Sequence, residues 1–321
     1  MCIRDSPTIN AFEATIAELE GAESARAFAS GMGAVSAVVL GICSSGDHVV
    51  AQRQMYAGTQ LFLQTVCPRM GIDVTFVDGT MPGSFAEAVV PGRTMLVFAE
   101  TPANPRLDLV DLDDLGAIAN ALTVVDSTFA TPLGQRPLDH GVDLVLHSAT
   151  KGIAGNNDAT LGVIAGSEDL ISWLWGFAIL QGANASPYDA YNAHRGIRTL
   201  GARLRQQSET SLVLAEFLEG HRDVLGVRHP GLPSHPQHDL AGGIDAGRRF
   251  VEATAIARQA TSLGGPETLV CHSATTTHVS LTPEELEASG IGEGTVRVSC
   301  GLEHLDDLMA DFVRGLDATG N

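Results

Sequence analysis

A carboxylate and a lysine lie at or just after the ends of two apolar stretches of the sequence. If both stretches are strands of one sheet, the two groups could lie close together. Asp126 ends the apolar stretch 123–126, and the segment 148–151, Ser-Ala-Thr-Lys, follows the stretch 144–147. In open α/β sheets ligands bind outside the carboxyl ends of the strands, so both groups would reach one crevice. A lysine for a Schiff base, a carboxylate for a ring nitrogen and donors for a phosphate suit pyridoxal phosphate. Taken alone, Asp126 also fits a strand-end cap and Lys151 a solvated surface charge.

The elements that would position these groups alternate between strands and helices. Short β-branched runs bounded by Gly, Pro or Asp, with helical patterns between them, indicate βα units on a mostly parallel sheet. The sequence therefore predicts an α/β protein whose sheet lies before residue 170. The expected strands are 48–51, 74–77, 94–99, 123–126, 144–147 and 162–165.

Helical periodicity divides the chain near residue 200. A long helical pattern over 204–218 is followed by a Pro-rich loop at 229–238 and weaker periodicity. We expect a large cofactor-binding domain over 1–200 and a small α+β domain over 201–321, closed by an amphipathic helix near 305–316. Earlier helices are expected around Phe12, Ile16 and Leu19 and over 32–40.

Composition narrows the class of protein and its partners. The 321 residues are 44% hydrophobic, enough for a large core, and carry a formal net charge of −19. This charge argues against nucleic acid or an anionic membrane as a partner. The five cysteines are scattered and form no CxxC pair, which favours a reducing cytoplasm over a disulfide framework or a zinc site. No secretory signal or membrane-spanning run is visible.

Ordered motifs along the chain carry a family resemblance. They are 29–32 (ASGM), 56–59 (YAGT), 101–105 (TPANP), 125–132 (VDSTFATP), 147–151 (HSATK), 234–238 (SHPQH), 262–265 (SLGG) and 296–299 (VRVS). In these motifs the sequence resembles the Cys/Met metabolism family of pyridoxal phosphate enzymes, which includes cystathionine γ-synthase, cystathionine lyases, methionine γ-lyase and the O-acylhomoserine sulfhydrylases. The resemblance implies an aspartate aminotransferase-like fold with a large cofactor domain and a smaller C-terminal domain.

The resemblance assigns three residues to the cofactor ring. Lys151 would form the Schiff base and, once displaced by substrate, move the α-proton. Asp126 would face the pyridine nitrogen and keep it protonated, so that the ring acts as an electron sink. Tyr56 would stack on the ring and serve as acid or base at the leaving group, although a tyrosine here also fits simple core packing.

The resemblance places the cofactor phosphate at a helix start. The backbone amides of Gly31 and Met32 open a helix, where unpaired donors and the helix dipole favour an anion. The hydroxyls of Ser148 and Thr150 would add hydrogen bonds to the phosphate. An ordinary helix cap at Ser30 explains the same residues without a ligand.

The substrate carboxylate is assigned to the C-terminal half. By resemblance Arg297 would clamp it in a bidentate fashion, assisted by Ser262 and Asn104. Without the family pattern Arg297 would be interpreted as a surface charge on a strand. His235 and His238 form an apparent metal pair, but the family shares this loop without binding metal, so we expect no metal site.

Two departures from the family pattern affect the completeness of the chain. Only Pro7-Thr8 remains of the family's YSRxxNPT motif, whose Tyr and Arg reach the phosphate of a neighbouring subunit. Met1–Ser6 resembles foreign sequence, so we expect an N-terminally truncated chain. A strand of the small domain is expected to be missing between Ala241 and Gly242, which should weaken that domain.

The residues that distinguish members of the family by substrate do not identify the leaving group. Cystathionine-handling members commonly have an Arg and a Glu where this chain has Leu61 and Thr261. Methionine γ-lyases often have a Cys where this chain has Gly58. The sequence therefore does not choose between elimination and replacement at the γ-carbon.

Three hypotheses follow for the function. The first is a cytoplasmic pyridoxal phosphate enzyme that acts at the γ-carbon of a sulfur-containing or O-acylated homoserine-type amino acid and assembles as a homotetramer of active-site dimers. The second is a catalytically impaired, truncated fragment of the same family. The third, a nicotinamide dehydrogenase, draws on Gly31-Met32-Gly33, but Ser36 occupies the third glycine position of its motif.

Overall fold

The computed structural model describes residues 6–232, 234–235 and 257–318. The chain forms two compact units, one from residues 1–104 and 108–199 and the other from 105–107 and 200–321. The long helix α8 (Pro187–Glu219) contributes residues to both. Among the residues described, no helix is long and apolar enough to cross a membrane. Two expectations fall outside the described residues. They are the foreign segment Met1–Ser6, of which only Ser6 is described, and the deletion between Ala241 and Gly242.

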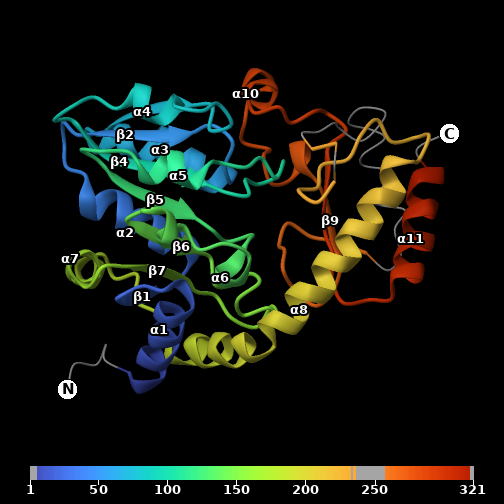
Figure 1. The fold of residues 1–321 in the computed structure, drawn as a ribbon, viewed down its shortest axis with the longest axis horizontal. Coiled ribbons are helices and arrows are strands. Elements are labelled where there is room, and N and C mark those ends of the chain that lie inside the picture. The colour runs from blue at the N-terminus through green and yellow to red at the C-terminus, as the bar shows by residue number, and fades with distance from the viewer. Residues whose placement is uncertain (1–5, 233, 236–256, 319–321) are drawn as a thin grey trace. The chain divides into compact units, whose positions relative to one another are not determined.

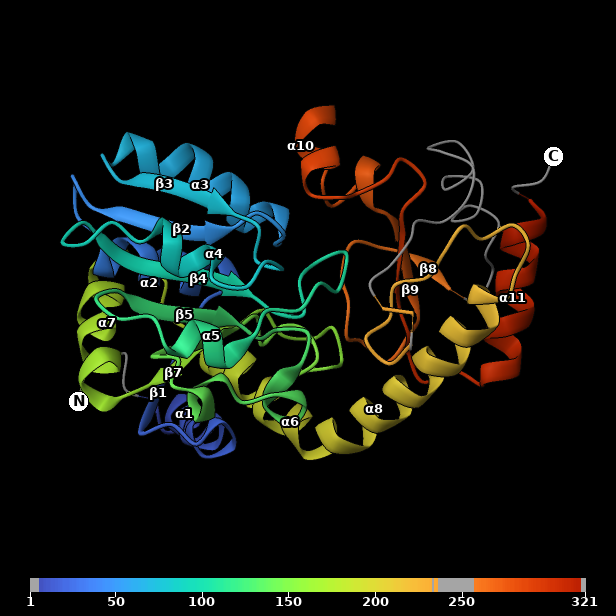
Figure 2. The same ribbon diagram turned by 45° about the horizontal axis from the view of Figure 1, so that its top comes forward.

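A seven-stranded sheet forms the centre of the first unit, with the order β1-β7-β6-β5-β4-β2-β3 (Figures 1 and 2). Its strands are β1 (Ser24–Phe28), β2 (His48–Gln52), β3 (Asp73–Val77), β4 (Thr94–Glu100), β5 (Leu122–Asp126), β6 (Leu144–His147) and β7 (Gly162–Gly166). The strands β2 to β6 pair in parallel, and β7 is antiparallel to both of its neighbours. The expected mostly parallel sheet is therefore confirmed.

Helices cover both faces of this sheet, which explains why its central strands are apolar throughout. One face packs against α2, α3 and α7, and the other packs against α1, α4 and α5 (Figures 1 and 2). The bounds are α1 Pro7–Glu20, α2 Gly31–Ile42, α3 Ala57–Arg69, α4 Ser84–Ala88, α5 Leu112–Gly116, α6 Thr131–Gly134, η1 Pro137–His140 and α7 Glu168–Gln181.

A three-stranded sheet of order β10-β9-β8 organises the described part of the second unit. After α8, the described elements of this unit are β8 (Arg258–Gln259), β9 (Leu269–His272), η2 (Ser273–Thr275), α10 (Pro283–Ala288), β10 (Val296–Ser299) and α11 (Leu305–Asp317). Leu308, Phe312 and Leu316 of α11 are buried at helical spacing, and Phe312 and Leu316 pack in one cluster with Val270 and Val296. The amphipathic C-terminal helix expected from the sequence is thus confirmed.

The expected strands differ from the observed ones by at most one residue at an end, but β1 has no counterpart among them. Ser24–Phe28 is short and contains Arg26, so it lacks the apolar run on which the prediction depended. Long-range pairing with β7, from Ser24 opposite Gly166 to Phe28 opposite Gly162, makes it a strand. The helix expected over 204–218 is also longer, because it begins at Pro187.

Candidate active site

The carboxyl ends of three parallel strands gather the candidate residues of the first unit. Glu100 ends β4, Asp126 ends β5 and lies opposite Glu100 in the strand register, and His147 ends β6. Ser148 and Lys151 follow β6 directly. Parallel strands present these ends at one edge of the sheet, where open α/β proteins bind ligands.

Asp126 is held by the segment that follows it and is linked through that segment to Ser148. Oδ1 of Asp126 accepts a hydrogen bond of 3.0 Å from the Thr128 backbone N–H and another from the Thr128 hydroxyl. The same hydroxyl oxygen accepts a 2.8 Å hydrogen bond from the Ser148 backbone N–H. One threonine therefore connects the candidate ring carboxylate to the candidate phosphate segment.

Burial raises the pKa of Asp126 above its ordinary value, although the Thr128 bonds and the charge of His147 act in the opposite direction. Burial also raises the pKa of Glu100 well above its ordinary value, and the neighbouring Asp126 raises it further. Two buried carboxyls on adjacent strands resist carrying two negative charges. A cation placed at Asp126 would relieve this repulsion, which fits a protonated ring nitrogen.

The start of α2 lies against Ser148. Ser30 caps the helix, because its side chain accepts a 3.0 Å hydrogen bond from the Gly33 backbone N–H. A Cβ atom at Gly31 would lie only 2.8 Å from the Cβ of Ser148. Glycine thus permits the helix start and the Ser148 hydroxyl to approach each other, which forms a cradle suited to a phosphate. Met32 is the next residue of α2, and its sulfur accepts a 3.9 Å contact from the hydroxyl of Thr59 on α3.

The turn after β6 holds the backbone of Lys151. Its N–H donates to the Ser148 carbonyl at 3.0 Å, and its carbonyl accepts from the Gly155 N–H at 2.8 Å. The Thr150 hydroxyl donates to the Leu161 carbonyl and accepts from the Leu161 N–H. Thr150 therefore ties this turn to the segment before β7, and its phosphate contact stays a prediction. Lys151 is also the only lysine among the 19 Lys and Arg residues of the chain.

Glu100 joins Tyr56 and Asn104, both predicted site residues. Its Oε2 accepts a 2.8 Å hydrogen bond from the Tyr56 N–H, and its Oε1 accepts a 2.7 Å hydrogen bond from the Asn104 N–H. Tyr56 precedes α3, and its side chain is exposed, as stacking on a bound ring requires. From the sequence, Glu100 is interpreted only as a structural acid at a strand end, and Thr128 is given no role of its own. The signal for Glu100 was available, because it ends an apolar strand just as Asp126 does.

Arg297 and Ser262 lie in the second unit. Arg297 is on β10 and is only 6% exposed, so it is not the surface charge that its position alone would suggest. Its guanidinium donates to the carbonyls of Thr261 and Ser262 at 2.9 and 2.8 Å. The Ser262 main chain thus holds Arg297, while the substrate role of both residues stays a prediction.

The histidine pair considered as a metal site is only partly described. His238 lies outside the described residues. A ring nitrogen of His235 lies 3.3 Å from the Leu107 carbonyl, within hydrogen-bonding distance. The prediction of no metal here is not tested by this contact.

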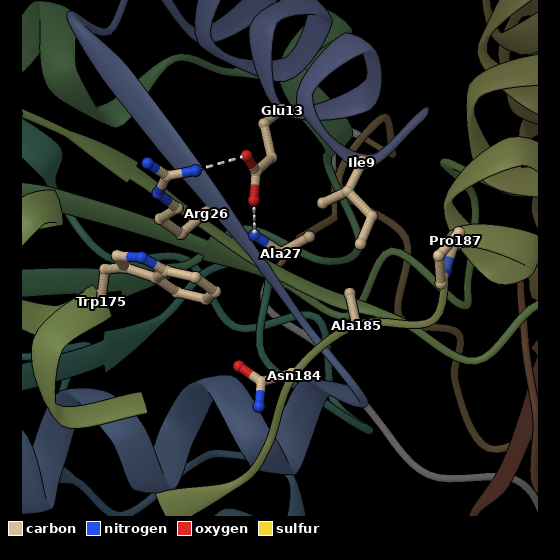
Figure 3. Close-up of a pocket in the computed structure, with 8 residues that line it drawn as sticks. All are labelled: Ile9, Glu13, Arg26, Ala27, Trp175, Asn184, Ala185 and Pro187. Atoms are coloured by element: carbon tan, nitrogen blue, oxygen red, sulfur yellow. Dashed lines mark hydrogen bonds and ion pairs between the residues drawn. The ribbon is translucent and has the colours of Figure 1, made fainter. Parts of the chain in front are cut away.

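A cavity of about 220 Å³ lies elsewhere in the first unit (Figure 3). Arg26 lies over the ring of Trp175, at 5.0 Å from its centroid, and forms an ion pair of 2.8 Å with Glu13. None of the predicted cofactor or substrate residues lines it. The cavity is lined by Ile9, Glu13, Arg26, Ala27, Trp175, Asn184, Ala185 and Pro187.

An open, mostly parallel sheet with a carboxylate and a lysine after neighbouring strands is the arrangement expected of the aspartate aminotransferase-like class of pyridoxal phosphate proteins. Within this class, the chain belongs to the family of Cys/Met metabolism PLP-dependent enzymes, whose sequence pattern matches residues 4–317. Family membership rules out the nicotinamide dehydrogenase alternative.

Named relatives and solved structures support this membership. The chain is 42% identical to O-succinylhomoserine sulfhydrylase of Pseudomonas aeruginosa, over 98% of this chain and 82% of that protein. It is 41% identical to L-methionine gamma-lyase of Porphyromonas gingivalis, over 98% and 84%. The structure of cystathionine gamma synthase from Xanthomonas oryzae pv. oryzae in complex with cystathionine has a TM-score of 0.93 and 36% identity, over 98% of this chain and 87% of that one.

Proposed function

We propose that the protein catalyses elimination or replacement at the γ-carbon of a sulfur-containing or O-acylated homoserine-type amino acid, with pyridoxal phosphate as cofactor. The relatives named as a sulfhydrylase, a gamma-lyase and a cystathionine gamma synthase support this reaction class. Because they include both lyases and a sulfhydrylase, the proposal covers both outcomes.

The observation that carries the proposal is the continuous link from Asp126 through Thr128 to Ser148, with Gly31 packed against Ser148. It joins a buried carboxylate to a helix N-terminus across one sheet edge. A ligand with a cationic ring nitrogen at one end and a phosphate at the other matches this arrangement. Gly31, Met32, Ser148 and Thr150 would bind the phosphate.

Pyridoxal phosphate, when bound, supplies an electron sink for the electrons left by the departing α-proton. Lys151 would anchor the cofactor and take that proton on its Nζ atom. Asp126 would keep the ring nitrogen protonated. Tyr56 would cover the face of the ring and move a proton at the leaving group.

The substrate carboxylate would be bound by Arg297, with Ser262 and Asn104 assisting. A buried guanidinium that is already oriented by two carbonyls loses little freedom when it binds a carboxylate. This orientation supports Arg297 as the specificity determinant for α-amino acids.

We also propose that 1–200 is the cofactor domain and 201–321 the small domain, and that four copies form a homotetramer of active-site dimers in the cytoplasm. The support is the family pattern, in which a Tyr and an Arg complete the cofactor pocket of a neighbouring subunit, although this chain has only Pro7-Thr8 of that motif. Size-exclusion chromatography with light scattering tests this assembly, and a result of monomer only would contradict it. The burial of Cys43, Cys67, Cys271 and Cys300 as free thiols is compatible with a reducing compartment.

The sole lysine makes cofactor attachment testable at one atom. The protein is mixed with pyridoxal phosphate, its visible spectrum is recorded, and borohydride reduction is followed by peptide mass spectrometry. We expect a visible band and a reduced adduct on Lys151, both absent from Lys151→Ala. Product formation is then measured with L-methionine as substrate, and with O-succinyl-L-homoserine in the presence and absence of sulfide. A wild-type protein without the band and adduct would overturn the proposal.

The same experiment decides the alternative of a catalytically impaired fragment. Its motivation is the pair of departures at residues 1–6 and 241–242. Attachment of the cofactor to Lys151 without any product from these substrates would favour the fragment hypothesis. Product formation that depends on Lys151 would eliminate it.

A further inference from the structure

The main chain of Glu100 is fixed independently of its carboxyl group. The Gln52 side chain on β2 accepts from the Glu100 N–H at 2.9 Å and donates to the Glu100 carbonyl at 2.7 Å. Glu100 is only 3% exposed and ends β4 beside Asp126 on β5. The direction in which its carboxyl group leaves the strand is therefore set by the sheet.

Each carboxyl oxygen of Glu100 is used by a different segment of the site. One accepts from the N–H of Tyr56, the residue before α3, and the other from the N–H of Asn104, in the loop after β4. Glu100 therefore joins the residue before α3 to the loop after β4 through one side chain. A carboxylate is suited to this task because both of its oxygens accept, whereas a glutamine has one acceptor and would turn a donor toward the other N–H.

The position of this group also has an electrostatic consequence. A buried carboxyl beside Asp126 is unfavourable unless its hydrogen bonds or a nearby cation compensate. The hydrogen bonds from the Tyr56 and Asn104 amides favour the ionised form of Glu100 and so oppose the burial that raises its pKa.

We propose that Glu100 is a positioning residue of the active site, whose carboxylate holds the backbones of Tyr56 and Asn104 and thereby sets the position of the Tyr56 ring against the bound cofactor. The proposal rests on the proposed function, because the ring and the amide side chain matter only if this edge binds pyridoxal phosphate. Glu100 itself touches neither substrate nor cofactor in this scheme.

The test compares Glu100→Gln with the matched control Glu13→Gln. Glu13 is comparably buried at 5%, and its carboxyl accepts a backbone N–H, from Ala27, at 2.8 Å, but it lies outside the site. For each protein we measure the melting temperature, the Kd for pyridoxal phosphate and the induced circular dichroism of the bound cofactor. Glu100→Gln is expected to raise the Kd about tenfold, the effect of one lost hydrogen bond to a charged group, and to change the dichroism. Glu13→Gln is expected to lower only the melting temperature.

A double-mutant cycle separates positioning from general packing. If Glu100 acts through Tyr56, Glu100→Gln should weaken cofactor binding much less in a Tyr56→Ala background than in the wild type. Additive effects, or a Glu100→Gln protein whose Kd and dichroism match those of Glu13→Gln, would overturn the proposal. If Glu100→Gln does not fold, Glu100→Asp is used with the same readouts, because it keeps the charge but cannot reach both amides.

The two proposals fail in different ways. A wild-type protein that forms no adduct on Lys151 contradicts the proposed function itself. A wild-type protein that binds the cofactor normally, beside a Glu100→Gln protein with the same Kd and dichroism, contradicts only the role of Glu100.

Discussion

Gly31 and Ser148 are in such close contact that a single methyl group on Gly31 would lie 2.8 Å from the Cβ of Ser148. The contact joins the start of α2 to the turn after β6, which are far apart in the sequence. It is the point where the helix N-terminus and a hydroxyl converge, and it depends on the absence of a side chain.

Gly31→Ala should therefore weaken cofactor binding. The added Cβ must push α2 away from Ser148, and overpacking of this kind costs about 1–3 kcal/mol. We expect the Kd for pyridoxal phosphate, measured by absorbance titration, to rise roughly ten- to hundredfold. The control is Gly176→Ala in α7, where a Cβ meets nothing within 4 Å. An unchanged Kd for Gly31→Ala would contradict the proposal that the contact between Gly31 and Ser148 forms the phosphate site.

Thr128→Val should uncouple Asp126 from the phosphate segment. Valine keeps the shape but removes the hydroxyl that donates to Asp126 and accepts from the Ser148 N–H. Leaving such a group without its partner costs about 1–3 kcal/mol, which urea unfolding would detect. Thr65→Val, on the exposed face of α3, should change stability by less than about 0.5 kcal/mol. Equal effects of the two substitutions would contradict the proposed link.

Asp126→Asn should change how the stability of the cofactor-free protein depends on pH. Because the folded pKa of Asp126 is raised from 3.8, the folded state retains a proton that the unfolded chain has lost. Stability is therefore lost as pH rises from the unfolded value through the folded one. The variant lacks this loss, so the difference between its free energy of unfolding and that of the wild type should shift in favour of the variant as the pH rises above about 4. A pH-independent difference in urea titrations would show that the pKa is not raised.

Arg297→Lys should raise the KM for the amino-acid substrate while leaving the Kd for the cofactor unchanged. A lysine cannot donate to the Thr261 and Ser262 carbonyls and also present a bidentate fork to a carboxylate. Loss of a charged hydrogen bond of about 1.5–3 kcal/mol corresponds to roughly ten- to hundredfold in KM. Arg314→Lys on α11 serves as the control. Equal KM values for both variants would remove Arg297 from the substrate site.

Three thiols should resist modification until the protein unfolds. Burial raises the pKa of Cys43 to about 12, of Cys67 to about 11 and of Cys300 to about 12, and nearby acidic groups add to the effect at Cys43 and Cys300. Since the thiolate is the reactive form, iodoacetamide at pH 8 should label these residues slowly in the native protein and rapidly in urea, with peptide mass spectrometry to assign each site. Fast native labelling of any of the three would show that it is not buried as described.

Local patterns predicted most of the large sheet and failed at its edge. Strands such as β6 consist of a continuous apolar run, so their burial is visible in the residue types themselves. The strand β1 contains Arg26 and depends on its antiparallel pairing with β7. Its environment is therefore decided by a partner that is distant in the sequence, and no local period shows it.

The sequence by itself determined the family and most strand positions. Its motifs, which occur in the family's order, also implied the chemistry of Lys151 and Asp126. Only the tertiary structure decided that Glu100 bonds to the amides of Tyr56 and Asn104, that Thr128 joins Asp126 to Ser148, and that Arg297 is buried. The physical reason is that residue type and spacing determine local conformation and burial preference. Hydrogen bonds between segments depend instead on strand register and on how closely two backbones approach, which a single sequence does not display.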